Sequence, residues 1–150
     1  MYCGVDSFYS VLKHLNSEYP AQNLTHIAVF NIDSINTCYG EKNIPYVKQK
    51  VFELTENFAK EINLPLVRLE SNFQDVIPQN HFLSHTYMDA LAIYSMQKLW
   101  RVYYYASSHS FKNFSLAENF QSAPAHFELM LLDCLSTSAL KIISSGRECN

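Results

Sequence analysis

The chain is 150 residues long, with 48% hydrophobic and 17% charged residues and a formal net charge of −3. This composition predicts a globular chain with a sizeable core and argues against disorder. The basic residues are scattered, and no apolar run approaches the roughly 20 residues of a membrane span. We therefore expect a cytoplasmic protein with a small-molecule partner, rather than one that binds nucleic acid or a membrane.

Glycine and cysteine usage argues against several kinds of site. The chain has 3 glycines, which cannot supply the glycine-rich dinucleotide fingerprint or the P-loop of nucleoside triphosphatases. Its 4 cysteines, Cys3, Cys38, Cys134 and Cys149, include no Cys-x-x-Cys pair. This spacing favours free thiols over a zinc site or a redox dithiol.

The first predicted element is a helix over about residues 6–17, introduced by the turn Gly4-Val5-Asp6-Ser7. The first N–H groups of a helix have no partners within it, and the helix dipole places partial positive charge beside them, so such a turn can bind an anion. Gly4 allows close approach of the backbone to a ligand. Asp6 or Ser7 can cap the helix, and the Ser7 hydroxyl adds a donor.

Residues 24–31 are rich in β-branched and apolar side chains and predict a buried parallel strand. Asn31 and Asp33 follow at its carboxyl end, where ligands bind in open α/β sheets. These two residues are therefore candidates for a binding site. The alternative is a polar loop that caps the next element.

The middle of the chain alternates between helix and strand patterns. Apolar spacing of three and four predicts a long helix over about 45–62, followed by a short strand over 64–70. Residues 71–86 predict a long polar loop, and residues 85–98 predict a well-buried helix. This order predicts an α/β fold with a parallel sheet.

A further strand pattern covers the aromatic residues 100–105 and ends at a hydroxyl-rich cluster that includes Ser107 and Ser108. Parallel strands bring their carboxyl ends to one edge of a sheet. We therefore expect this cluster, the residues after the first strand and the loop at Gly4 to converge on one site.

The end of the chain is less regular. Residues 113–126 predict a short helix or lid. Residues 127–133 match either a fifth strand or a buried helical segment, because so short an apolar run fits both. The element order that we predict ends on a strand at this position.

The turn Gly4-Val5-Asp6-Ser7 resembles the PP-loop, Ser-Gly-Gly-x-Asp-Ser, of the ATP pyrophosphatase (adenine nucleotide alpha hydrolase-like) superfamily. Tyr2 stands in place of its first Ser and Cys3 in place of its first Gly, so the match is to a degenerate loop. Looser similarity lies at Ser107-Ser108 and at Leu135-Ser136-Thr137. The resemblance implies a three-layer, mostly parallel Rossmann-like sheet with helices on both faces, and a site for ATP and Mg²⁺.

In that superfamily the loop grips the pyrophosphate end of ATP while an acceptor oxygen attacks the α phosphate. The resemblance therefore implies adenylation of a small acid, amide or carbonyl substrate with release of pyrophosphate. It implies a catalytic role for Asp6 and Ser7 and places Asp6 near the metal. The ATP-binding residues that it implies are Gly4, Val5, Asp6, Ser7, Asn31, Asp33, Ser107 and Ser108.

The PP-loop of the family follows a central strand, whereas only Met1 and Tyr2 precede Cys3 here. We expect this first strand to be missing, and residues 1–150 to form one PP-loop-like domain that is incomplete at both ends. The alternative is a catalytically inactive remnant that acts as a nucleotide-binding or oligomerising structural domain. An uncovered sheet centre would favour a homo-oligomer.

Overall fold

A computed structural model describes most of the chain. The chain divides into two compact units. The described residues are 5–15, 23–30, 44–72, 76, 81–107, 109–116 and 124–147. The N-terminal unit is Met1–Val76 and the C-terminal unit is Ile77–Asn150. Each unit combines helices with parallel strands, which confirms the predicted α/β class. The expectation of one PP-loop-like domain stays a prediction.

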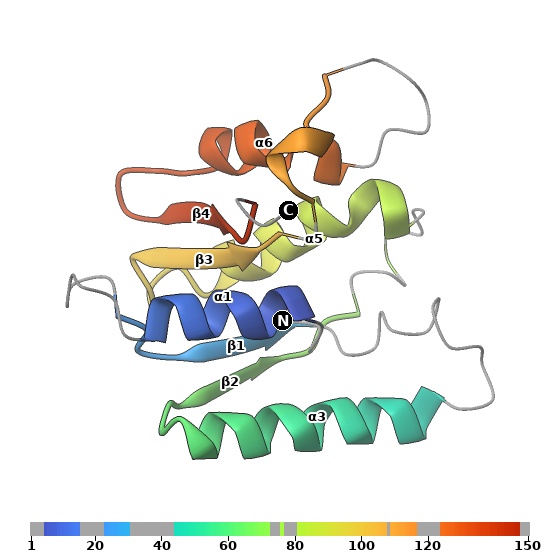
Figure 1. The fold of residues 1–150 in the computed structure, drawn as a ribbon, viewed down its shortest axis with the longest axis vertical. Helices are drawn as coiled ribbons and strands as arrows, with labels where there is room; N and C mark the ends of the chain where they lie inside the picture. The colour runs from blue at the N-terminus through green and yellow to red at the C-terminus, as the bar shows by residue number, and fades with distance from the viewer. Residues whose placement is uncertain are drawn as a thin grey trace. The chain divides into compact units, whose positions relative to one another are not determined.

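The N-terminal unit follows the order that the sequence predicts (Figure 1). Its elements are α1 (Val5–Leu15), β1 (Ile27–Phe30), α3 (Ile44–Glu61) and β2 (Leu66–Leu69). The strands β1 and β2 are parallel, with Ile27 beside Leu66 and Phe30 beside Leu69. The apolar periodicities therefore identified the helices and strands of this unit that the structure describes.

The core of the N-terminal unit joins both helices to β1. Val11 of α1, Ile27 of β1 and Ala59 of α3 form one buried cluster. Phe8 and Phe58 add an edge-to-face contact between the two helices, with ring centroids 4.7 Å apart. The first helix therefore packs against β1 through Val11 and against α3 through Phe8.

The helix α3 ends in a left-handed cap at Asn63, whose φ is 55°. The N–H of Leu64 donates to the carbonyl oxygen of Ala59 at 2.9 Å, and the N–H of Asn63 donates to that of Lys60 at 3.1 Å. This pair of bonds is the Schellman arrangement, which satisfies carbonyl groups at the end of a helix. Asn tolerates the left-handed region better than other non-glycine residues, so it turns the chain into β2.

We predict that Asn63→Val lowers the free energy of unfolding by about 1–2 kcal/mol, because a β-branched side chain clashes with the backbone at positive φ. Asn63→Gly should be at least as stable as the wild type. Urea unfolding, monitored by circular dichroism, measures the free energy of unfolding of both variants. The matched control is Asn57→Val, the same replacement at an exposed position inside α3. Equal losses for the two valine variants would contradict the prediction.

The described part of the C-terminal unit contains two parallel strands with helices between and before them (Figure 1). Its elements are α5 (His81–Ser95), β3 (Val102–Ala106), η4 (Phe111–Asn113), η5 (Pro124–His126), α6 (Glu128–Cys134) and β4 (Lys141–Ser145). Val102 lies beside Lys141, and Ala106 lies beside Ser145. The carboxyl ends of β3 and β4 therefore meet at one edge.

Three features of this unit differ from the sequence prediction. The helix α5 begins at His81, inside the stretch predicted as a loop. Residues 128–134 form the helix α6. Of the two alternatives for residues 127–133, the helical segment is therefore correct, and the strand that ended the predicted element order is wrong. The strand at Lys141–Ser145 was not predicted, because polar and apolar residues do not alternate in its sequence. It is a strand because it pairs with β3 through backbone hydrogen bonds.

The link between α6 and β4 is built by hydroxyl groups. Ser136 Oγ accepts a hydrogen bond from the N–H of Ile142 at 2.9 Å, and Thr137 Oγ1 accepts one from the N–H of Leu140 at 3.0 Å. Short hydroxyl side chains often stabilise turns in this way. The Leu135-Ser136-Thr137 segment thus has an internal role: it turns the chain from the helix into the last strand.

The described strands form two separate parallel pairs, β1–β2 and β3–β4. They confirm parallel pairing, and the three-layer Rossmann-like sheet with a missing first strand stays a prediction.

No helix in the described part of the chain is both long enough and apolar enough to cross a bilayer. Cys134 is a free, exposed thiol, as predicted, and the other three cysteines lie outside the described residues.

Candidate functional site

A polar site lies where β3 and β4 end. The N–H of Ser107, the residue after β3, donates to the carbonyl oxygen of Ser145 at 2.9 Å and extends the ladder by one bond. Gly146 then takes a φ of 97°, a region that favours glycine because it has no Cβ. The chain turns sharply there, and the next residue, Arg147, is buried.

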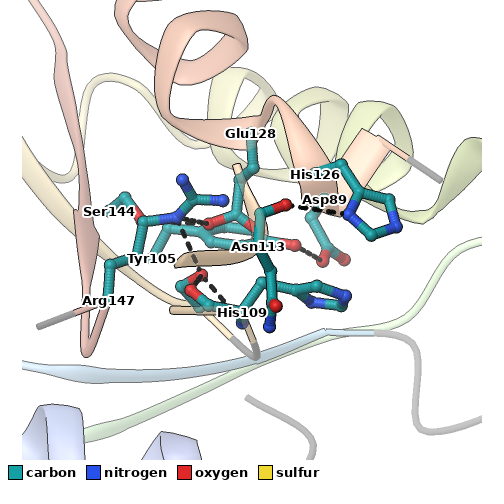
Figure 2. Close-up of polar contacts among 9 residues, drawn as sticks. Asp89, Tyr105, His109, Asn113, His126, Glu128, Ser144 and Arg147 are labelled. Carbon is teal, nitrogen blue, oxygen red and sulfur yellow. Dashed lines mark hydrogen bonds and ion pairs between the residues drawn. The ribbon is translucent and has the colours of Figure 1, made fainter. Parts of the chain in front are cut away.

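Ser107, Glu128, Ser144 and Arg147 form the buried polar cluster of this site, in which Ser144 is half-buried and the other three are buried (Figure 2). The side chains of Arg147 and Glu128 are 2% and 1% exposed, and Arg147 Nε lies 3.7 Å from Glu128 Oε1. The same Nε donates to Ser107 Oγ at 3.2 Å. Ser144 Oγ donates to Glu128 Oε1 at 2.9 Å. The cluster therefore joins the end of β3, the start of α6 and the end of β4.

Burial raises the pKa of the Glu128 carboxyl above its ordinary value, and this effect outweighs several opposing ones. Hydrogen bonds from Ser107 and Ser144 lower the pKa, as do the charges of Arg147 and His85. Glu128 also lies in the first turn of α6, where the helix dipole favours negative charge. The site thus holds a carboxyl whose ionisation is costly despite a guanidinium beside it.

The Ser107 hydroxyl contacts the backbone of His109, two positions further along the chain. It accepts a hydrogen bond from the N–H of His109 at 3.3 Å, and its oxygen lies 3.2 Å from the carbonyl oxygen of the same residue. Since the hydroxyl carries one proton, it can donate either to this carbonyl or to Glu128. The N–H of Phe111 donates to the carbonyl oxygen of Arg147 at 3.0 Å. Ser107 and Phe111 are therefore both bonded to the end of β4 or to the residues just after it.

Two further polar pairs border the cluster (Figure 2). Tyr105 Oη donates to Asp89 Oδ2 at 3.2 Å. The rings of His109 and His126 meet edge to face with centroids 5.0 Å apart, and His126 Nδ1 lies 3.0 Å from the carbonyl oxygen of Asn113. Because a carbonyl oxygen only accepts, this bond places the hydrogen on Nδ1. The edge of the β3–β4 pair thus carries carboxyl, imidazole, hydroxyl and guanidinium groups.

The residues predicted from the PP-loop resemblance are only partly described. Val5, Asp6 and Ser7 occupy the first turn of α1, where Asp6 is exposed and Ser7 is buried. Ser107 belongs to the buried polar cluster, in the other unit. Gly4, Asn31, Asp33 and Ser108 lie outside the described residues. The predicted convergence of these residues on one ATP site stays a prediction.

A metal role for Asp6 also stays a prediction. Among the described residues, no group of three or more His, Cys, Asp or Glu side chains is arranged to hold a metal ion. The exposed carboxylate of Asp6 is an oxygen ligand of the kind that Mg²⁺ takes together with water and substrate phosphates. A site of that kind needs few ligands from the protein.

Sequence reasoning missed Glu128, Ser144 and Arg147. One signal was present, because Glu128 is a lone charge at the start of an apolar run, and such a charge is buried only with partners. The sequence did not reveal the partner, since Arg147 is 19 positions away and is brought back by the β4 strand.

Comparison of the chain with protein-family models, curated proteins and solved structures finds no match.

We predict that the wild-type protein loses stability relative to Glu128→Gln as the pH rises above 4.5, the ordinary pKa of the carboxyl. The raised pKa means that the folded protein binds this proton more tightly than the unfolded chain. The resulting stability is present below pH 4.5 and is lost as the pH rises through the folded-state pKa. Urea unfolding of both proteins between about pH 4 and 8 measures the difference.

The control for this experiment is Glu61→Gln, which changes an exposed carboxyl at the end of α3. Its free energy of unfolding should follow that of the wild type at every pH. A constant difference between the wild type and Glu128→Gln across the range would refute a raised folded-state pKa.

Proposed function

We propose that the chain is the ATP-binding domain of an ATP pyrophosphatase-type enzyme that adenylates a small acid, amide or carbonyl substrate and releases pyrophosphate. The observation that carries this proposal is the start of α1 at Val5. The stretch that resembles the PP-loop, Gly4-Val5-Asp6-Ser7, therefore leads into the first turn of a helix, where N–H groups can bind phosphate. The proposal includes a three-layer, mostly parallel Rossmann-like sheet.

In this proposal the first turn of α1 binds the pyrophosphate end of ATP. The backbone N–H groups of Val5, Asp6 and Ser7 and the Ser7 hydroxyl donate to phosphate oxygens. The exposed carboxylate of Asp6 would hold Mg²⁺, which supplies charge neutralisation to the phosphates. An acceptor oxygen then bonds to the α phosphorus, and the bond from that phosphorus to pyrophosphate breaks.

A specific observation also favours the second candidate, a catalytically inactive domain that oligomerises. Val5, Tyr9 and Leu12 are exposed apolar residues on α1, with Val5 84% and Leu12 58% exposed. Their spacing of four and three places them on one face of the helix. Exposed apolar stripes of this kind are common where a second protein surface packs.

We predict that the protein binds ATP with Mg²⁺ and that Ser7→Ala and Asp6→Ala each raise the Kd about tenfold or more. Each removes a charge-assisted contact, to phosphate or to the metal, worth about 1.5–3 kcal/mol. Isothermal titration measures the Kd, and release of AMP and pyrophosphate with candidate acids tests turnover. Ser10→Ala, the same replacement one turn later at another buried serine of α1, is the control. No binding at millimolar ATP by the wild type would refute the proposal.

The second candidate predicts that the wild-type protein sediments as an oligomer whether or not ATP is present. Leu12→Lys should shift it to the monomer, because a charge in an apolar interface is left without a partner. The matched control is Leu54→Lys, at a leucine of α3 that is 59% exposed. Analytical ultracentrifugation distinguishes the outcomes, and a monomeric wild-type protein would rule this candidate out.

A further inference from the structure

Two histidine rings meet beyond the carboxyl end of β3, and neither has a role in the ATP proposal. The ring centroids of His109 and His126 are 5.0 Å apart, and the ring planes are inclined by 73° (Figure 2). His109 follows β3 and His126 ends η5, so the fold of the C-terminal unit brings them together. Both residues are half-buried, which leaves part of each accessible to a ligand.

The hydrogen bond of the His126 ring determines which of its nitrogens can bind a ligand. Nδ1 lies 3.0 Å from the carbonyl oxygen of Asn113, so it carries the hydrogen. In the neutral ring the lone pair is then on Nε2. Histidines that bind a metal ion usually donate their other ring N–H to a carbonyl or carboxyl group in this way, which fixes the orientation of the ring.

Both histidines are also held by their backbone groups. The carbonyl oxygen of His126 accepts the N–H of Ser115 at 3.2 Å. The N–H of His109 donates to Ser107 Oγ at 3.3 Å. Ligands that are held in place before binding lose less conformational entropy when a metal ion arrives.

The separation of the two rings fits a shared metal ion. Zinc bonds to imidazole nitrogens at about 2.0–2.1 Å in tetrahedral geometry, which places the centroids of two rings on one ion about 5 Å apart. The observed separation is 5.0 Å. An anion fits less well, because Asn113 takes the one N–H of the neutral His126 ring and leaves only a lone pair for a ligand.

We propose that His109 and His126 bind one Zn²⁺ ion through a ring nitrogen of each residue, which is Nε2 in His126. Imidazole suits zinc, copper and nickel ions, whereas Mg²⁺ and Ca²⁺ prefer oxygen ligands. The described residues hold no group of three or more His, Cys, Asp or Glu side chains arranged for a metal, so water takes the remaining positions on the ion. This site is independent of the ATP proposal and of its Mg²⁺ at Asp6.

Isothermal titration of Zn²⁺ into the wild-type protein, without nucleotide, tests the site. His109→Gln and His126→Gln should each raise the Kd about tenfold or more, because even the loss of an outer-shell partner of a ligand weakens metal binding by about 10–100-fold. Mg²⁺ should show no binding that depends on either histidine.

Two control variants test whether the effect is specific to this pair. His26→Gln removes a histidine of the N-terminal unit, and Cys134→Ser removes an exposed thiol, which is another ligand that zinc prefers. Neither replacement should change the Kd. Circular dichroism checks that every variant is folded.

If a histidine variant does not fold, nuclear magnetic resonance of the wild-type protein replaces it. Zn²⁺ should then shift the ring signals of His109 and His126 more than those of the other histidines. A wild-type Kd in either folded histidine variant, unshifted ring signals of the pair, or no binding at millimolar Zn²⁺ would overturn the proposal. Because no nucleotide is present, none of these outcomes depends on whether ATP binds at α1.

Discussion

The C-terminal unit depends on the burial of two opposite charges, Glu128 and Arg147. Neither charge is tolerated inside a protein alone, so each requires the other and the hydroxyls of Ser107 and Ser144. That requirement fixes the relative positions of three segments that are far apart in the sequence: the end of β3, the start of α6 and the end of β4. The glycine after β4 makes the arrangement possible, because its positive φ turns the chain toward the cluster.

The two units differ in whether their polar side chains are exposed or bonded to one another. In the N-terminal unit Val11 of α1 packs against β1, while Asp6 in the first turn of the helix is exposed. In the C-terminal unit the polar groups at the strand ends are turned inward and bonded to one another. The ATP proposal rests on the first arrangement, because an exposed carboxylate is accessible to a ligand.

Prediction succeeded where a local pattern was long or strongly periodic. The helical spacing from Val47 to Ile62 predicted α3, and the β-branched run before Asn31 predicted β1. It failed where the pattern was short. Residues 127–133 fit strand and helix equally, and Lys141–Ser145 is a strand because β3 lies beside it. For the site, sequence patterns singled out Ser107 but none of its partners, since a hydrogen bond over 40 positions has no local signature.

The sequence by itself determined the α/β class, the elements of the N-terminal unit and the polar turn at the start of α1, because periodicity and helix-start chemistry are local properties. Only the tertiary structure decided the identity of α6, the existence of β4 and the buried polar cluster. The physical reason is that these depend on pairing between distant segments. The stability of a buried charge or a short parallel strand comes from a partner elsewhere in the chain.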